Sequence, residues 1–331
     1  MPLDEHRPLR IAILGCGAIA RQHAATLGRF PGVQVGFASR DLRRAEAYAA
    51  RHRGFRAYPS YAAAIDDRAV DATLIATPPS EHFHLTIESL RAGKPALVEK
   101  PAFTDTAEAD RIIAASKETG QQVMVLENYG YKPLTRVLRT LIAAGDVGEV
   151  RHIRLNALKR QDTWGWRQDP ALCAGGALFE GGIHWLHLLA TLGPDVDRVE
   201  GFAPPVTGGF ERSILVVAKY TNGAIGTLHH AWDAPVQWKG LALSHIIGSR
   251  GTITFESNGL FVGVRGVRGR RIIIPGLRDI RGVRAMFADF IMALRTARPP
   301  ALTLERARAD LGLVEDAYRT AGIKREAPTP C

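Results

Sequence analysis

The sequence predicts an α/β protein of two domains, a doubly wound parallel sheet followed by an α+β domain with a mostly antiparallel, open sheet. Up to about residue 128, short and wholly apolar segments alternate with helix-like ones, which is typical of parallel strands covered on both faces. Beyond that point strand-like segments succeed one another across turn signals, which favours hairpins. At 331 residues the chain is longer than one core usually organises. We therefore expect domains at residues 1–128 and 129–331, with the terminal helices able to pack back on the first.

Strands and helices alternate regularly in the first domain. Apolar runs predict strands at Leu9–Leu14, Val33–Ala38, Ala72–Ala76, Ala96–Val98 and Val123–Leu126. The segments between them predict helices at Ile19–Gly28, Leu42–His52, Glu81–Ala92 and Ala107–Thr119. Gly93 and Gly120 follow the last two helices, where glycine commonly ends a helix because it adopts positive φ freely.

The second domain is predicted to be richer in strands. They are expected at Val150–Leu158, Ile214–Tyr220, Ala224–His230, Leu241–Ile247, Thr252–Phe255 and Leu260–Val264. Its helices are expected at Leu134–Ala144, Ala177–Leu192, Val283–Thr296 and Leu304–Thr320. Arginines crowd residues 265–271 without interleaved aromatic residues, which favours a solvated hairpin over a nucleic-acid site.

A glycine turn joins the first strand to the first helix. It reads Gly15-Cys16-Gly17-Ala18-Ile19, and Ala20 occupies the third small position of a dinucleotide-binding fingerprint. The first glycine makes the bend, the second lets a pyrophosphate approach bare backbone, and the helix N-terminus favours its negative charge. This placement predicts a Rossmann-type domain that binds a nicotinamide dinucleotide through these residues.

The end of the second strand bears on which dinucleotide binds. Ser39 and Arg40 suit a 2′-phosphate, because a guanidinium binds phosphate oxygens in bidentate fashion, and Arg44 adds positive potential. Asp41 is a competing signal, since an acidic side chain here would bind a free ribose; it is also a suitable N-cap for the next helix. The corner favours NADP(H), with NAD(H) as the alternative.

Composition narrows the class of protein further. Forty-three Lys and Arg against 33 Asp and Glu give a net charge of +10, which makes an anionic partner plausible without naming one. The three cysteines are too few and too scattered for a disulfide framework or a paired zinc site, so we expect a cytoplasmic protein. No apolar stretch approaches a membrane span, so no membrane partner is expected.

Four motifs taken together resemble one family. They are Glu99-Lys100-Pro101, Thr77-Pro78-Pro79 with His82, Trp166-Arg167 with Pro170, and the run from Gly175-Gly176 to Gly181-Gly182-Ile183-His184. With the glycine turn they make the chain similar, over nearly its whole length, to the glucose-fructose oxidoreductase, inositol dehydrogenase and MocA (Gfo/Idh/MocA) family. The resemblance implies hydride transfer between a nicotinamide and a hydroxyl or keto carbon of a sugar, sugar derivative or cyclitol.

The resemblance also implies roles for individual residues. Lys100 matches the family's catalytic lysine and His184 its catalytic histidine, while Glu180 stands where the family commonly has Asp and would bind substrate or orient His184. His187 departs in the same way from a frequent Asp, and a buried histidine without a chemical role is its simplest interpretation. Glu180, His184 and His187 could also be read as metal ligands, but no fourth ligand is evident and no metal is expected.

The remaining predicted contacts fall into two groups. Cofactor contacts are expected from Thr77, Pro78, His82, Glu99 and Lys100, in addition to the glycine turn and the second-strand corner. Substrate contacts are expected from Asn128, Tyr131, Trp166 and Arg167, in addition to Lys100, Glu180 and His184. The family resemblance further implies a homodimer or homotetramer formed through the second sheet.

Two other functions remain open at this point. Some relatives of this fold cleave glycosides or eliminate a group through transient oxidation, so that the nicotinamide is regenerated. A nucleotide-sensing protein without turnover is the third possibility, although the presence of both Lys100 and His184 argues against it.

Overall fold

The computed structural model describes residues 7–163, 165–206, 209–236 and 241–325. Within these ranges the chain forms two compact units. The first contains residues 7–127 together with residues 286–308 from much later in the chain. The second contains residues 128–285 and 309–325. The return of residues 286–308 means that the first unit is built from two separate stretches of sequence.

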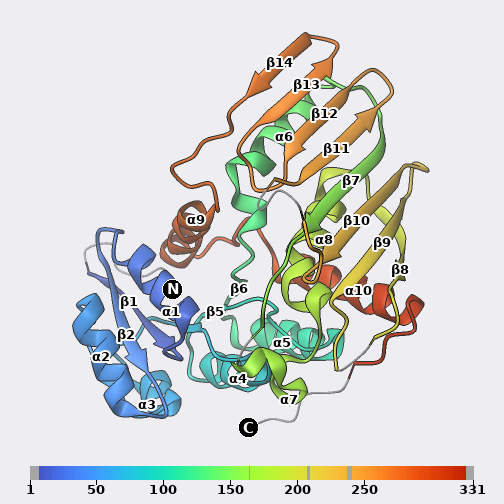
Figure 1. The fold of residues 1–331 in the computed structure, drawn as a ribbon. Helices are drawn as coiled ribbons and strands as arrows, with labels where there is room; N and C mark the ends of the chain where they lie inside the picture. Colours follow the sequence, from blue (N-terminus) through green and yellow to red (C-terminus); the bar gives the residue numbers. More distant parts are fainter. Residues whose placement is uncertain (1–6, 164, 207–208, 237–240, 326–331) are drawn as a thin grey trace. The chain divides into compact units, whose positions relative to one another are not determined.

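The first unit is the parallel α/β domain that the alternating pattern predicted (Figure 1). Its strands run in the order β3-β2-β1-β4-β5-β6, all parallel. They are β1 (Leu9–Leu14), β2 (Val33–Ala38), β3 (Ala57–Tyr58), β4 (Ala72–Ile75), β5 (Ala96–Val98) and β6 (Val123–Val125). The helices are α1 (Ala18–Leu27), α2 (Leu42–His52), α3 (Tyr61–Asp66), η1 (Pro79–Glu81), α4 (His82–Arg91), α5 (Thr106–Thr119) and α9 (Val283–Thr296). β3 and α3 escaped the sequence analysis because they are too short to show a period.

Side-chain caps fix where three of these helices begin. Asp41 accepts a hydrogen bond from Arg43 N at the start of α2, which confirms its predicted role as an N-cap. Ser60 and Asp105 do the same for α3 and α5. Because β1 and β4 are neighbours and their connections diverge, the strand order places a topological switch point at their carboxyl ends. The loops that carry the predicted cofactor residues all leave the sheet at this edge.

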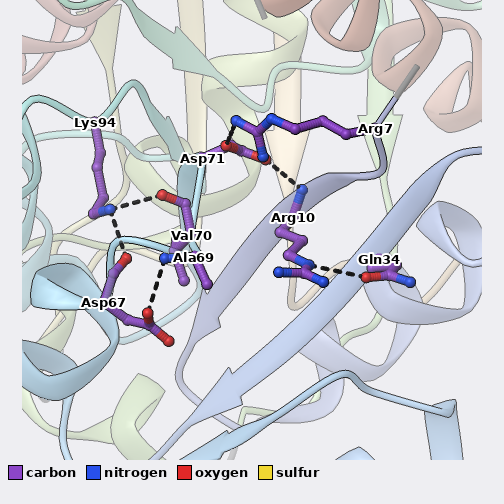
Figure 2. A network of polar contacts seen from close by, with 8 residues as sticks. All are labelled: Arg7, Arg10, Gln34, Asp67, Ala69, Val70, Asp71 and Lys94. Carbon is purple, nitrogen blue, oxygen red and sulfur yellow. Dashed lines mark hydrogen bonds and ion pairs between the residues drawn. The ribbon is translucent and has the colours of Figure 1, made fainter. Parts of the chain in front are cut away.

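The opposite, amino edge of this sheet is closed by a polar network (Figure 2). Asp71, just before β4, accepts hydrogen bonds from the Arg7 guanidinium and, at 2.9 Å, from Arg10 N of β1. Lys94 Nζ donates to the carbonyl oxygens of Asp67 and Val70 at 2.9 and 2.7 Å. The Asp71 contacts tie β1 to the start of β4, and the Lys94 contacts tie the segment before β5 to the segment before β4. They lie at the end remote from the loops of interest, so we assign them a structural role.

The second unit contains a sheet in the order β14-β13-β12-β11-β7-β10-β9-β8 (Figure 1). It is antiparallel except for the parallel pair β7 and β10, which confirms the predicted mostly antiparallel sheet. The strands are β7 (Val150–Leu158), β8 (Val196–Phe202), β9 (Ser213–Tyr220), β10 (Ile225–Ala231), β11 (Leu243–Gly248), β12 (Thr252–Glu256), β13 (Val262–Gly266) and β14 (Gly269–Ile273). The arginine-rich run forms the β13–β14 hairpin, as predicted.

The second unit also contains helical segments. They are η2 (Tyr129–Tyr131), α6 (Pro133–Ala143), η3 (Gly165–Gln168), α7 (Pro170–Cys173), η4 (Leu178–Gly182), α8 (Ile183–Leu192) and, for its second-unit part, α10 (Leu304–Thr320). α8 packs on β7 and β10. No helix among the described residues is both long and apolar enough to span a bilayer.

The predicted continuous helix over Ala177–Leu192 is wrong in its first turn. Leu178–Gly182 forms a π-helix, and α-helical geometry begins only at Ile183. Glycines let the backbone approach its neighbours here: a Cβ at Gly182 would lie 2.7 Å from Leu178 Cδ1, and one at Gly181 would lie 3.1 Å from the Trp232 ring. The wider turn changes the relation between Glu180 and His184 that four-residue α-helical spacing implied.

Candidate functional site

The glycine turn has the geometry that a dinucleotide requires. Gly15 has φ of +100°, and a side chain there would meet Ala76 O at 2.9 Å. Gly17, by contrast, faces open space, because a Cβ built on it meets nothing within 4 Å. α1 starts directly after Gly17 with no side-chain cap and no acidic residue in its first turn. An exposed helix N-terminus beside a bare glycine fits a pyrophosphate group.

Two further side chains line this turn. Thr77, at the carboxyl end of β4, approaches Gly15, and its buried Oγ1 has no hydrogen-bond partner within the described residues. An unsatisfied buried hydroxyl beside the phosphate turn is a second feature that fits a bound nucleotide. Burial raises the pKa of the Cys16 thiol to about 11, so Cys16 is a packing residue rather than a reactive one.

The predicted 2′-phosphate corner brings its basic residues together. Ser39 is buried, and its Oγ accepts a hydrogen bond from Asp41 N at 3.2 Å. Arg40 is exposed, and burial raises the pKa of Tyr61 while the positive charges of Arg40 and Arg44 oppose that rise. Arg40 and Arg44 therefore act electrostatically on the same phenol, and the Asp41 carboxylate is engaged in capping α2.

Lys100 follows β5, and its backbone is held by Glu99. The Glu99 carboxylate accepts a hydrogen bond from Lys100 N at 3.0 Å and contacts the buried His23 ring of α1. The His23 ring in turn packs edge-on against Phe287 of α9, with centroids 5.2 Å apart. The Lys100–Pro101 peptide bond is cis. Sequence analysis missed His23, because nothing in its spacing connects it with Glu99, 76 residues later.

His82 lies between two loops of the carboxyl edge. Its Nδ1 is 3.0 Å from Pro101 O and its Nε2 is 3.0 Å from Thr77 O. The ring is buried, and this burial lowers its pKa. Both ring nitrogens therefore face backbone carbonyl groups, so His82 links the Thr77-Pro78 loop to the Lys100 loop.

In the second unit, Arg167 and Glu180 form a direct ion pair. Arg167 Nε donates to Glu180 Oε1 at 2.6 Å, and the Glu180 side chain is 9% exposed. A nearly buried carboxylate that a guanidinium binds in this way is held in one position. Trp166 lies in η3 beside Arg167, and its side chain lies outside the described residues.

His184 is stacked on Tyr129. The two ring centroids are 4.5 Å apart with an interplanar angle of 7°, and Lys132 Nζ lies 4.4 Å from the Tyr129 centroid. Tyr129 was passed over in favour of Tyr131, because both follow the same strand and spacing does not choose between them. Asn128 donates through Nδ2 to Arg281 O at 2.5 Å, which anchors the start of this segment.

His187 has a structural partner. Its buried Nδ1 lies 2.8 Å from Asp310 Oδ2 of α10, which agrees with a buried, hydrogen-bonded histidine. Gly130 packs against the same ring, since a Cβ there would lie 3.0 Å from His187 Nε2. Across the part of the chain that the structure describes, no three His, Cys, Asp or Glu side chains gather as a metal site.

A pocket of about 850 Å³ in the second unit borders this constellation. Tyr129 and Trp185 line it, and the two rings meet edge-on at 5.2 Å. Polar lining comes from Asn156, Lys159, Arg160, Asp162, Ser257 and Asn258. Aromatic walls with polar groups between them suit a polyhydroxylated ring of moderate size.

Comparison with known families agrees with these observations. Residues 9–127 match the family described as "Oxidoreductase family, NAD-binding Rossmann fold", and residues 135–254 match the "GFO/IDH/MocA C-terminal domain". These matches cover more than half of the chain and confirm the resemblance. The protein belongs to the Gfo/Idh/MocA family of nicotinamide-dependent oxidoreductases.

Individual relatives have low sequence identity to this chain. Trans-1,2-dihydrobenzene-1,2-diol dehydrogenase of Bos taurus is 27% identical over 228 residues, which are 66% of this chain and 67% of the relative. Levoglucosan dehydrogenase, solved with NADH and levoglucosan, has a TM-score of 0.86 at 18% identity, covering 96% and 98% of the two chains. An oxidoreductase from Agrobacterium radiobacter, solved with NAD+, L-tartaric acid and magnesium, has a TM-score of 0.84 at 21% identity, covering 95% and 96%. The two solved structures support the fold.

Proposed function

We propose that this protein is an NADP(H)-dependent dehydrogenase or reductase that acts on a hydroxyl or keto carbon of a sugar, sugar derivative or cyclitol. The observation that carries the proposal is the second-unit constellation of Tyr129, His184, Glu180 and Arg167 beside a wide, polar-lined pocket. The second support is membership of a family whose first domain binds a nicotinamide dinucleotide. When bound, the nicotinamide supplies or accepts the hydride.

Three side chains are assigned the acid–base work. The Lys100 ammonium polarises a carbonyl oxygen or stabilises a developing alkoxide, and Glu99 holds its backbone in place. His184 accepts the proton of a substrate hydroxyl, because an imidazole changes charge near neutral pH. Glu180, fixed by Arg167, accepts hydrogen bonds from substrate hydroxyl groups.

NADP(H) is proposed as the preferred cofactor because of the corner after β2. Gly15, Cys16, Gly17, Ala18 and Ile19 would hold the pyrophosphate, with Thr77 and Pro78 beside it. Arg40 and Arg44 would bind the 2′-phosphate, and Ser39 would donate to it. Asp41 already caps α2, which lessens its competition as a ribose ligand.

A homodimer or homotetramer through the second sheet is part of the proposal. Ile225, Leu243 and Ile247 are exposed, and they occupy alternate, outward positions on strands β10 and β11. Exposed apolar side chains that recur on one sheet face suit a subunit interface. Light scattering of the purified protein gives the oligomeric state, and charged substitutions at Ile225 and Ile247 should shift it towards monomer.

A spectrophotometric screen of the purified protein against sugars, keto-sugars and cyclitols, with both nicotinamide cofactors, tests the function. Lys100→Ala should lower turnover at least about 100-fold, because the ammonium that polarises the substrate oxygen is lost. Nucleotide binding should stay within about threefold, because the glycine turn and the corner after β2 are kept. Lys117→Ala, an exposed lysine on α5, is the control. Turnover that survives in Lys100→Ala would remove Lys100 from the mechanism, and nucleotide binding with no activity on any compound would contradict an oxidoreductase.

A further inference from the structure

A buried acidic residue outside the predicted site contacts the start of the helix that carries Glu180 and His184. Glu211 precedes β9, and its carboxylate Oε1 accepts hydrogen bonds from Leu178 N at 2.6 Å and from the Tyr318 hydroxyl at 2.8 Å. The backbone oxygen of Glu211 also accepts from Ala177 N at 3.0 Å. One residue thus binds two consecutive amides at the entry to the π-helix.

Tyr318 of α10 completes this arrangement. Its hydroxyl accepts a hydrogen bond from Phe179 N at 3.0 Å while it donates to Glu211. The amides of residues 177, 178 and 179 are therefore all bound by side chains or backbone that come from elsewhere in the second unit. The first amides of a helix lack intrahelical partners, and external acceptors here fix where the turn begins.

The surroundings leave this cluster little freedom. Glu211 is 4% exposed and Tyr318 is 2% exposed, and a Cβ at Gly176 would overlap the Glu211 carboxylate. Arg325 lies over the rings of Phe179 and Tyr318, at 5.1 and 5.8 Å from their centroids. Because the cluster is closely packed, a shift of the Glu211 or Tyr318 side chain is passed on to its neighbours rather than taken up by empty space.

We propose that Glu211 and Tyr318 act as positioning residues, which hold residues 177–179 so that Glu180 and His184 stand in their working positions. Glu180 is the next residue after the three bound amides, and His184 follows on the same helical segment. Neither Glu211 nor Tyr318 touches the substrate in this scheme. The catalytic part of the proposal rests on the function proposed above, and the positional part stands on the contacts alone.

Tyr318→Phe removes the hydroxyl that serves both Glu211 and Phe179 while keeping the ring. Amide hydrogen exchange of residues 177–184 should then quicken at least tenfold, and kcat should fall at least tenfold with nucleotide affinity unchanged. Tyr220→Phe is the matched control. It removes another buried hydroxyl, which donates to Leu189 O at 2.7 Å in the later part of α8, and it should leave exchange in 177–184 unchanged.

The proposal is overturned if exchange over 177–184 is the same in Tyr318→Phe and wild type, if Tyr220→Phe raises it equally, or if it rises without any fall in kcat. If Tyr318→Phe does not fold, Glu211→Met takes its place, because it keeps the length of the side chain and removes the oxygen that binds Leu178 N and the Tyr318 hydroxyl, with the same expected and contrary results. Failure of the proposed function has a different signature, because the wild-type protein would then turn over no screened compound while the exchange comparison still decides the positional claim.

Discussion

The imidazole of His184 and the phenol of Tyr129 lie face to face, 4.5 Å apart and within 7° of parallel. Trp185 meets the same phenol edge-on, and Lys132 lies near its ring. Tyr129 is therefore held on several sides, and it limits the orientations open to His184. A stacked pair of this kind contributes about 0.5–1.5 kcal/mol beyond the area it buries.

Replacing the Tyr129 ring should impair catalysis through His184. Tyr129→Leu is expected to lower kcat about tenfold, since loss of the stack lets the imidazole turn away from its working orientation. Tyr129→Phe keeps the ring and should retain more activity than Tyr129→Leu. Steady-state kinetics on the substrate found in the screen measures both, and equal losses in the two variants would remove stacking as the cause.

Arg40 should determine the choice between the two nicotinamide cofactors. Arg40→Ala is expected to weaken NADP(H) binding about 10- to 100-fold, the value of one charge-assisted contact to phosphate, and to leave NAD(H) binding unchanged. Titration by fluorescence or calorimetry measures both. Arg51→Ala, exposed in the last turn of α2, the helix that follows Arg40, is the control. Equal weakening of the two cofactors would contradict a 2′-phosphate contact.

Glu211 should make stability depend on pH. Burial raises its pKa to about 7 from an ordinary value of 4.5. Between those values the folded protein holds a proton that the unfolded chain has released, so the free energy of unfolding falls as pH rises. The fall is at most about 1.4 kcal/mol per pH unit, or roughly 3 kcal/mol over the range.

Glu211→Gln cannot ionise and should lose this dependence. Urea unfolding at pH 5, 6 and 7 measures the free energy of unfolding of wild type and Glu211→Gln. The quantity compared is the change of this free energy with pH rather than its absolute value. Parallel slopes in wild type and Glu211→Gln would show that Glu211 titrates at its ordinary pKa in the folded protein.

The buried pair of His187 and Asp310 should matter for stability. Asp310→Ala leaves a buried imidazole without its carboxylate and is expected to lower the free energy of unfolding by about 3 kcal/mol. Asp316→Ala, on the same helix, is the comparison, because its ion pair with Arg319 is exposed and should contribute under about 0.5 kcal/mol. Similar losses of unfolding free energy in both variants would mean that burial of the His187–Asp310 pair adds nothing to stability.

Sequence was sufficient wherever the signal is local. The glycine turn, the Asp41 cap, the apolar parallel strands and the arginine-rich hairpin all depend on residues near one another in the chain. Tyr129, His23 and Glu211 were missed for the opposite reason. Each acts through a partner that only tertiary structure supplies, at separations of 76 residues for His23 and Glu99 and 107 for Glu211 and Tyr318.

The π-helix shows another limit of prediction from the sequence. The sequence from Ala177 to Leu192 is periodic enough to predict one α-helix, but the amides at its start are bound by Glu211 and Tyr318. Tertiary contacts therefore overrode a local preference at the point that places Glu180. Glu180 is still the residue that the sequence predicts, but only the structure gives its position relative to His184.

The return of α9 to the first unit bears on how such a gene could be recombined. Phe287 and Phe290 are fully buried, and Phe287 packs against His23, which contacts Glu99 next to Lys100. A single crossover near residue 128 would pair one parent's parallel sheet with another parent's α9, and mismatched side chains would meet beneath the lysine motif. Exchange of an intact nucleotide domain thus requires three junctions, one near residue 128 and one on each side of residues 286–308.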